Sequence, residues 1–154
     1  MLEDYAMRNI FSAALLGSAM TFAFANQAVA SEPLEVTLHK DPWCGCCTAY
    51  ADYLDENGFK TTRIDHQDMS PVKRKLGTHK AASCHTVEID GYVVEGHVPV
   101  AAINRMLKER PDIRGIALPG MPLNSPGMGP EKPGSLEVLS LDKDGNVTGL
   151  YQRL

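Results

Sequence analysis

Three of the four cysteines in this 154-residue chain lie within four consecutive positions, Cys44-Gly45-Cys46-Cys47. The preceding stretch, Glu35–Lys40, alternates apolar and polar side chains, as a half-buried β-strand does. The residues that follow have the three- and four-residue apolar spacing of a helix that buries one face. The residues on that face are Cys47, Tyr50, Ala51 and Leu54. The sequence therefore predicts a strand that leads through the cysteines directly into a helix.

Two more helices and three more strands are expected before residue 111. The strands are Lys60–Asp65, Thr86–Asp90 and Tyr92–Val94, and the helices span residues 70–76 and 99–110. Asp90-Gly91 is typical of the tight turn in a hairpin. Ser70 and Pro71 are typical of the cap and the first position of a helix. The resulting order, β-α-β-α-β-β-α, predicts an α/β fold built on a thioredoxin-like unit.

The rest of the chain adds a loop and a second hairpin. Repeated prolines and glycines in Ile116–Pro130 predict a loop, and this Gly/Pro/Met-rich loop carries Met121 and Met128. Leu136–Leu141 and Val147–Tyr151 predict a C-terminal β-hairpin. We expect these segments to extend the thioredoxin-like unit rather than to form a domain of their own.

The first thirty residues predict a secretory signal peptide. Arg8 precedes the apolar run Ile10–Phe24, and Ala28-Val29-Ala30 has the small-residue pattern of a cleavage site. A membrane-spanning helix needs roughly 20 apolar residues, and no later stretch of the chain reaches that length. We therefore expect residues 1–30 to be removed. Residues 31–154 then form one domain that is exported to the periplasm and has no membrane span.

Charge argues against nucleic acid as a partner. The formal net charge is −4 at pH 7, whereas nucleic-acid-binding domains carry a basic surface. The only basic run is Lys73-Arg74-Lys75, which we expect to form a solvated helix face.

The fourth cysteine, Cys84, is expected to return to the cluster. The segment Ala82–Gly91 resembles the loop, strand and turn that face the cysteine-bearing helix in glutaredoxins. That resemblance places Cys84 and His85 in a loop where such proteins usually carry a cis-proline, and no proline is present there. We therefore expect the Cys84 thiol to face the thiols of residues 44–47.

Thiols at a helix N-terminus favour the thiolate form, because free N–H groups and the helix dipole stabilise anions. Cu(I) is a soft ion that accepts two or three thiolates and lets them bridge several ions. Four crowded sulfurs therefore predict a multinuclear Cu(I)–thiolate cluster. Its candidate ligands are Cys44, Cys46, Cys47 and Cys84, with Met121, Met128, His85 and His97 as candidate auxiliaries. The auxiliaries also have structural interpretations, since methionines in Pro-Gly loops usually pack and His97 can serve as a hydrogen bonder.

Three other interpretations stay open. Cys44 and Cys47 have the Cys-x-x-Cys spacing of a thiol–disulfide oxidoreductase, although Cys46 and Cys84 would scramble or trap that pair. In an oxidising compartment the cysteines could instead form two structural disulfides, Cys44–Cys47 and Cys46–Cys84. A single zinc ion usually takes two separated Cys-x-x-Cys pairs, so the Cys-x-Cys-Cys spacing is cramped for it. These patterns favour metal binding over catalysis. They do not decide whether the protein is also an enzyme.

Four motifs occur in order along the chain. They are Cys-Gly-Cys-Cys, Ser-Cys-His-Thr, Asp-Gly-Tyr-Val-Val-Glu-Gly-His-Val-Pro and Pro-Gly-Met-Pro-x-x-Ser-Pro-Gly-Met. Together they resemble the CopG-type periplasmic copper-resistance family over nearly all of Glu35–Leu154. The resemblance implies a thioredoxin-like fold, Cu(I) binding by the four cysteines, and a role in copper tolerance beside other periplasmic copper proteins. It leaves open whether the protein stores, delivers or oxidises copper.

Overall fold

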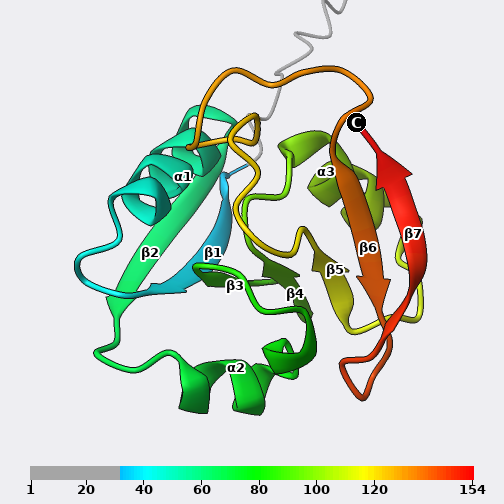
Figure 1. Ribbon diagram of the computed structural model, residues 1–154, viewed down its shortest axis with the longest axis horizontal. Coiled ribbons are helices and arrows are strands. Elements are labelled where there is room, and N and C mark those ends of the chain that lie inside the picture. Colours follow the sequence, from blue (N-terminus) through cyan, green and yellow to red (C-terminus); the bar gives the residue numbers. More distant parts are fainter. Residues whose placement is uncertain (1–31) are drawn as a thin grey trace, which may run out of the picture. The chain divides into compact units, whose positions relative to one another are not determined.

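The computed structural model describes residues 32–154, and the predicted signal peptide lies outside them. The strands are β1 Leu34–Lys40, β2 Phe59–Asp65, β3 Thr86–Ile89, β4 Tyr92–Glu95, β5 Gly115–Ala117, β6 Glu137–Leu141 and β7 Val147–Arg153 (Figure 1). The helices are α1 Gly45–Glu56, α2 Ser70–Leu76 and α3 Val100–Glu109, with a short 3-10 turn, η1, at His79–Ala81. The predicted α/β fold is confirmed, and the elements from β1 to α3 follow the predicted order. Within residues 32–154, no helix combines the length and apolar character that crossing a membrane requires.

The strands of this region join one sheet in the order β2-β1-β3-β4-β5-β6-β7. β1 runs parallel to β2 and antiparallel to β3, so the strand that leads into the cysteines lies inside the sheet. β3 and β4 form the predicted hairpin. The predicted C-terminal hairpin, β6 and β7, extends the sheet beyond β5.

Helices cover both faces of this sheet. Val93 and Val94 are consecutive residues of β4, so their side chains point to opposite faces. Val94 packs in the larger buried cluster with Leu54 of α1 and Ile103 of α3. Val93 packs in a smaller cluster with Leu76 of α2. The predicted apolar face of α1 is buried as expected, and α2 closes the other side of the sheet.

The predicted start of the loop, Ile116, is wrong, because a short strand occupies that position. Ile116 and Ala117 lie in β5, which pairs in parallel with β4. Gly115 allows this pairing, because a Cβ at that position would lie 1.8 Å from the carbonyl oxygen of Val93. The loop proper spans residues 118–136, between β5 and β6.

The predicted cap of α2 is also wrong. Ser70 is the first residue of the helix, and Met69 occupies the cap position without a side-chain hydrogen bond. The Asp68 carboxylate accepts the Ser70 N–H at 2.8 Å instead, because an aspartate side chain readily reaches the backbone two residues on. Pro71 is therefore the second residue of the helix, one position later than predicted, although it still lies in the first turn. The helix ends at Leu76, close to the predicted end, and Gly77 follows it in the left-handed conformation.

Candidate metal centre

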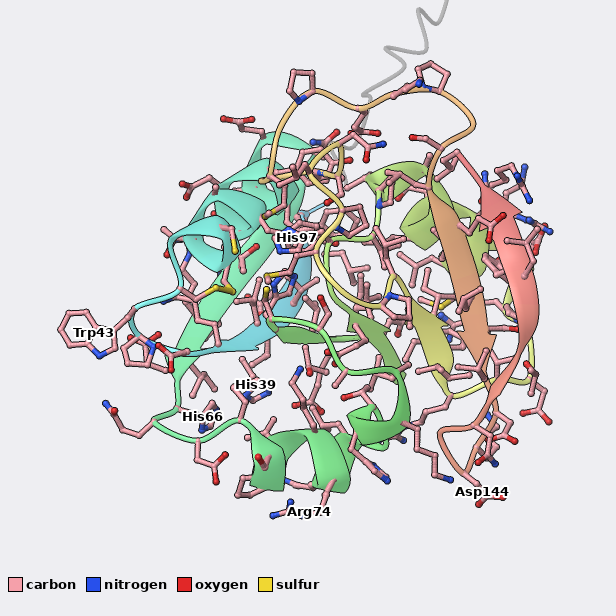
Figure 2. All side chains as sticks on the ribbon, in the orientation of Figure 1. His39, Trp43, His66, Arg74, His97 and Asp144 are labelled. Carbon is pink, nitrogen blue, oxygen red and sulfur yellow. A yellow bond between two sulfur atoms is a disulfide. The ribbon has the colours of Figure 1, made fainter. Side chains whose placement is uncertain are left out.

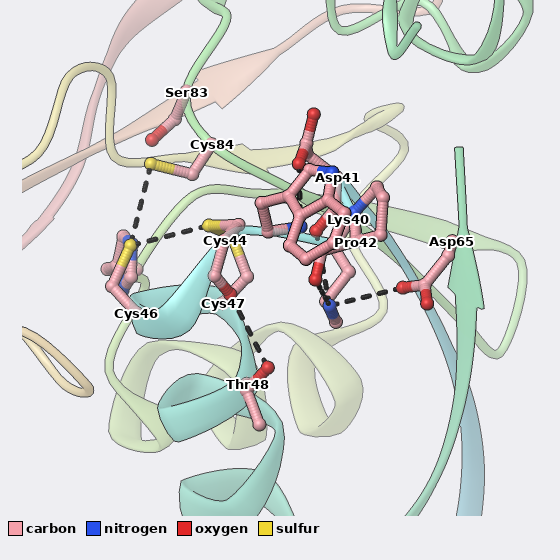
Figure 3. The surroundings of a disulfide bond; sticks show 12 residues. Lys40, Asp41, Pro42, Cys44, Cys46, Cys47, Thr48, Asp65, Ser83 and Cys84 are labelled. Atoms are coloured by element: carbon pink, nitrogen blue, oxygen red, sulfur yellow. Dashed lines mark hydrogen bonds and ion pairs between the residues drawn. A yellow bond between two sulfur atoms is a disulfide. The ribbon is translucent and has the colours of Figure 1, made fainter. Parts of the chain in front are cut away.

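The four cysteine sulfurs lie together where β1 leads into α1 (Figure 3). All four Sγ atoms are within 4.8 Å of one another. Cys44 and Cys47 form a disulfide, whereas Cys46 and Cys84 are free thiols. The Cys46 Sγ lies 3.5 Å from the Cys44 Sγ and 3.9 Å from the Cys84 Sγ. The prediction that Cys84 faces the other cysteines is confirmed, whereas the second bridge of the two-disulfide interpretation, Cys46–Cys84, is not formed.

A hydrogen-bonded turn carries the chain from β1 to the cysteines. The Cys44 N–H donates to the carbonyl oxygen of Asp41 at 3.1 Å, and the Trp43 N–H donates to the Asp41 carboxylate at 2.7 Å. The buried Lys40 ammonium donates to the same Asp41 carbonyl at 3.1 Å. This turn places Cys44 at the cap of α1 and the next two cysteines in its first turn. The Trp43 side chain points outward and is 87% exposed (Figure 2).

Cys84 differs from the other three cysteines because it lies on a loop rather than at the start of a helix. Burial, and then the neighbouring Cys46 thiol, raises the pKa of the Cys84 thiol to about 11. The expectation of a thiolate at a helix N-terminus therefore does not apply to Cys84, whose thiol is protonated at neutral pH. A metal ion that binds Cys84 must displace this proton.

Two buried histidines accompany the cluster. His85 follows Cys84, is fully buried, and has no hydrogen-bond partner at either ring nitrogen. The Nδ1–H of His97 donates to the carbonyl oxygen of Pro126 at 2.8 Å, which leaves its Nε2 without a partner. The His85 ring centroid lies 4.5 Å from that of Tyr50 and 4.7 Å from that of His97. Burial lowers the pKa of both histidines, that of His85 to well below its ordinary value, so both rings are neutral at pH 7.

The Gly/Pro/Met-rich loop packs against the start of α1. A Cβ at Gly127 would lie 2.8 Å from the backbone nitrogen of Tyr50 and 3.0 Å from the carbonyl oxygen of Cys46. Met128, the next residue, is half-buried, whereas Met121 is 57% exposed. The roles of both methionines as auxiliary ligands stay predictions.

A buried ion pair that was not expected from the sequence lies next to the Cys84 loop. Lys73 was expected on a solvated face, but it is buried, and its Nζ lies 2.5 Å from Glu95 Oε1. Arg74, the next residue of the basic run, points away from the sheet as expected (Figure 2). A signal was present at Glu95, because a carboxylate at the end of an otherwise apolar strand needs a buried partner.

Comparisons with known proteins bear on this arrangement. A family model described as "Protein of unknown function, DUF411" matches residues 81–128, which include Cys84 and Met128. Two solved structures, both named "Copper resistance protein copG" (Form 2 and Form 1), are each 43% identical to this chain, with a TM-score of 0.69. The matches cover 80% of this chain, together with 99% of the Form 2 chain and 98% of the Form 1 chain. The chain belongs to the CopG copper-resistance family.

Membership of the CopG family confirms the resemblance found in the four ordered motifs. The likeness to the solved CopG chains extends well beyond residues 81–128, because it covers 80% of this chain. A search of curated protein sequences finds no match.

Proposed function

We propose that this protein binds Cu(I) and serves in copper sequestration, transfer and tolerance. One observation carries the proposal: four cysteine sulfurs from two separate segments converge within 4.8 Å. Thiolates are soft ligands that bridge Cu(I) ions, so this set suits several ions in one cluster. The CopG-family relatives are named for copper resistance, which supports copper as the metal.

The copper-loaded form requires the Cys44–Cys47 disulfide to be opened. An external dithiol supplies the two electrons and two protons and becomes a disulfide itself. Cys44, Cys46, Cys47 and Cys84 then offer four sulfurs, each of which releases its proton when it binds metal. Cys47 is fully buried, so copper approaches past the partly exposed Cys44, Cys46 and Cys84.

Four further side chains are proposed as auxiliary ligands. His85 and His97 each have at least one ring nitrogen without a partner, and a neutral imidazole nitrogen is a common metal ligand. Met121 and Met128 lie in the loop that packs on α1, and their thioether sulfurs suit Cu(I). We propose that this loop covers the cluster and supplies a transient ligand during transfer.

The site of action is proposed from the sequence. Residues 1–30 have the pattern of a secretory signal, and export would place the cluster in the periplasm beside other copper-handling proteins. N-terminal sequencing of protein from a periplasmic fraction tests this, with Ser31 expected as the first residue. An unprocessed N-terminus on cytoplasmic protein would contradict it.

The test of copper binding is an anaerobic titration of the reduced protein with Cu(I) against a chromophoric Cu(I) chelator. We expect the wild type to take up several ions and Cys84→Ser to lose most of that uptake. Ala49→Ser, on the exposed side of α1, is the matched control and keeps wild-type uptake. A wild-type protein that removes no copper from the chelator would overturn the proposal.

A second function is favoured by one observation, the Cys44–Cys47 disulfide itself. A thiol–disulfide or copper-linked oxidoreductase would use this pair. Cys46→Ser and Cys84→Ser separate the two functions, because they remove copper ligands yet leave the dithiol. If both variants reduce a disulfide substrate at least as fast as the wild type, and none of the proteins binds Cu(I), the oxidoreductase function replaces the copper function.

A further inference from the structure

One buried carboxylate holds both ends of the short loop that carries Cys84. Glu95, the last residue of β4, has no exposed surface. Its Oε1 accepts the Ser83 N–H at 2.5 Å, and its Oε2 accepts the Thr86 hydroxyl at 2.6 Å. Ser83 and Thr86 flank Cys84-His85 in the chain. The path of these two residues is therefore fixed at each end by the same side chain.

Lys73 of α2 contacts the same carboxylate. Its Nζ lies 2.5 Å from Glu95 Oε1 and 3.2 Å from Thr86 Oγ1, and its side chain is only 9% exposed. A carboxylate buried without a cation would be strongly unfavourable. Lys73 thus permits a charged acceptor at Glu95, and charged acceptors make the stronger hydrogen bonds.

The backbone beside Glu95 contacts the same loop. The Gly96 N–H donates to the carbonyl oxygen of His85 at 3.0 Å. A Cβ at Gly96 would lie 2.5 Å from the Leu118 carbonyl oxygen and 2.7 Å from the Ser83 Cβ. The loop therefore packs on the end of β4 without space to shift toward it.

We propose that Glu95, paired with Lys73, is a positioning residue that fixes the Cys84 sulfur opposite the sulfurs of α1. Two thiolates on one metal ion lie within about 4.6 Å, given metal–sulfur bonds of about 2.3 Å as for zinc. The Cys46–Cys84 separation of 3.9 Å meets this limit. The proposal deepens the proposed copper function and rests on it only for the metal, because the position of the sulfur is measurable without any metal.

The metal-free test uses Cys44→Ser/Cys47→Ser protein, which retains Cys46 and Cys84 alone. In a glutathione redox buffer, the two thiols and one oxidised glutathione give the Cys46–Cys84 disulfide and two reduced glutathiones. The equilibrium constant of this exchange measures how well the Cys84 loop places the Cys84 sulfur for a bond to the Cys46 sulfur.

Glu95→Gln is added to that double variant. We expect the equilibrium constant to fall about tenfold or more, because freed loop residues must be ordered again before the bond can form. Thr86→Val removes only one of the two loop bonds and gives a smaller fall, and it serves as the test if Glu95→Gln does not fold. Glu137→Gln, an acid paired with Arg153 on the surface, is the matched control and leaves the constant within twofold.

The variant Ile103→Val, a core change in α3, distinguishes a positioning role of Glu95 from a purely structural one. Ile103→Val lowers the stability to unfolding but is expected to leave the glutathione equilibrium within twofold. The proposal would be overturned if Glu95→Gln and Thr86→Val both left the glutathione equilibrium constant within twofold of the parent value. It would also be overturned if Ile103→Val lowered that constant as much as Glu95→Gln does.

The same Glu95→Gln change in the four-cysteine protein connects the result to copper. We expect reduced Glu95→Gln to lose Cu(I) uptake toward the level of Cys84→Ser. If the wild type binds no Cu(I) while the glutathione constants fall as expected, the copper function fails and the positioning role stands. If the wild type and Glu95→Gln bind copper equally and the constants do not move, the positioning role fails and the copper function stands.

Discussion

His85 is unusual among the residues that the structure describes. It is fully buried, yet neither of its ring nitrogens has a hydrogen-bond partner. A buried polar group without a partner typically costs about 1–3 kcal/mol. The metal-free protein therefore carries a local destabilisation next to Cys84, which a bound metal ion or a fully apolar side chain would relieve.

His85→Phe should stabilise the metal-free protein, and more so in acid. The unfolded histidine binds a proton below its ordinary pKa of 6.5, whereas burial keeps the folded pKa well below that value. Wild-type stability therefore falls as the pH drops below 6.5, by about 1.4 kcal/mol per pH unit from this residue. Phenylalanine cannot bind a proton, so the gain should be larger at pH 5 than at pH 8.

Urea unfolding of wild type and His85→Phe at pH 5, 6 and 8 measures this difference. His79→Phe is the control, because His79 is exposed, and it should change stability equally at all three values. A gain for His85→Phe that does not vary with pH would contradict the assignment of a neutral, buried ring.

The basic run of α2 divides into residues of opposite character. Lys73→Met leaves Glu95 buried without its cation, and breaking such a pair typically costs about 3–5 kcal/mol. Arg74→Met, one residue along and exposed, should change the free energy of unfolding by less than about 0.5 kcal/mol. Guanidinium unfolding of both variants provides the measurement, and small effects of equal size would show that Lys73 is not a buried partner.

Among the elements, the Gly/Pro/Met-rich loop makes a close contact with α1 at Gly127, and a single substitution can test it. Gly127 and Gly120 both have positive φ, +77° and +75°, so alanine at either position is strained by a similar amount. Only Gly127 touches α1, since nothing lies within 4 Å of a Cβ built at Gly120. Gly127→Ala should therefore cost about 1–3 kcal/mol more than Gly120→Ala, because it overpacks the loop against the helix.

Thermal and denaturant unfolding of the two glycine variants compare these costs directly. Cu(I) uptake, measured in parallel, shows whether the loop helps to hold the cluster. Equal unfolding free energies for the two variants would mean that the loop can leave α1 without loss.

Elements with local signals could be predicted from the sequence, and elements fixed by distant contacts could not. Asp90-Gly91 turns the β3–β4 hairpin, as expected from its own residues. β5 has only three residues, too few for a periodic pattern, and it exists because Gly115 allows close approach to β4.

The same distinction applies to the metal centre. The three clustered cysteines are evident in the sequence, and Cys84 was placed by the likeness of its loop to that of glutaredoxins. The Lys73–Glu95 pair joins residues 22 positions apart on different elements. Neither residue reveals its partner locally, so the pair could be found only in three dimensions.

At the scale of the whole molecule, copper would tie together segments that are distant in the chain. The Cys46 and Cys84 sulfurs are 38 positions apart in sequence, and a ligand that binds only the folded state stabilises it. Free Cu(I) at 100 times its dissociation constant should add about 2.7 kcal/mol for each binding site to the stability of the reduced protein.

Anaerobic urea unfolding, followed by circular dichroism with and without Cu(I), tests this prediction. The stabilisation should shrink in Cys84→Ser and remain in Ala49→Ser. A shift of equal size in Cys84→Ser would indicate that copper is held by the helix cysteines alone.

While the Cys44–Cys47 disulfide is closed, each molecule offers two free thiols, and once it is opened each molecule offers four. On the proposed function, the amount of copper that a fixed number of molecules can hold therefore depends on electron supply as well as on metal supply. A change in the reducing power around the protein would then raise or lower its copper-holding capacity without the synthesis or degradation of a single chain.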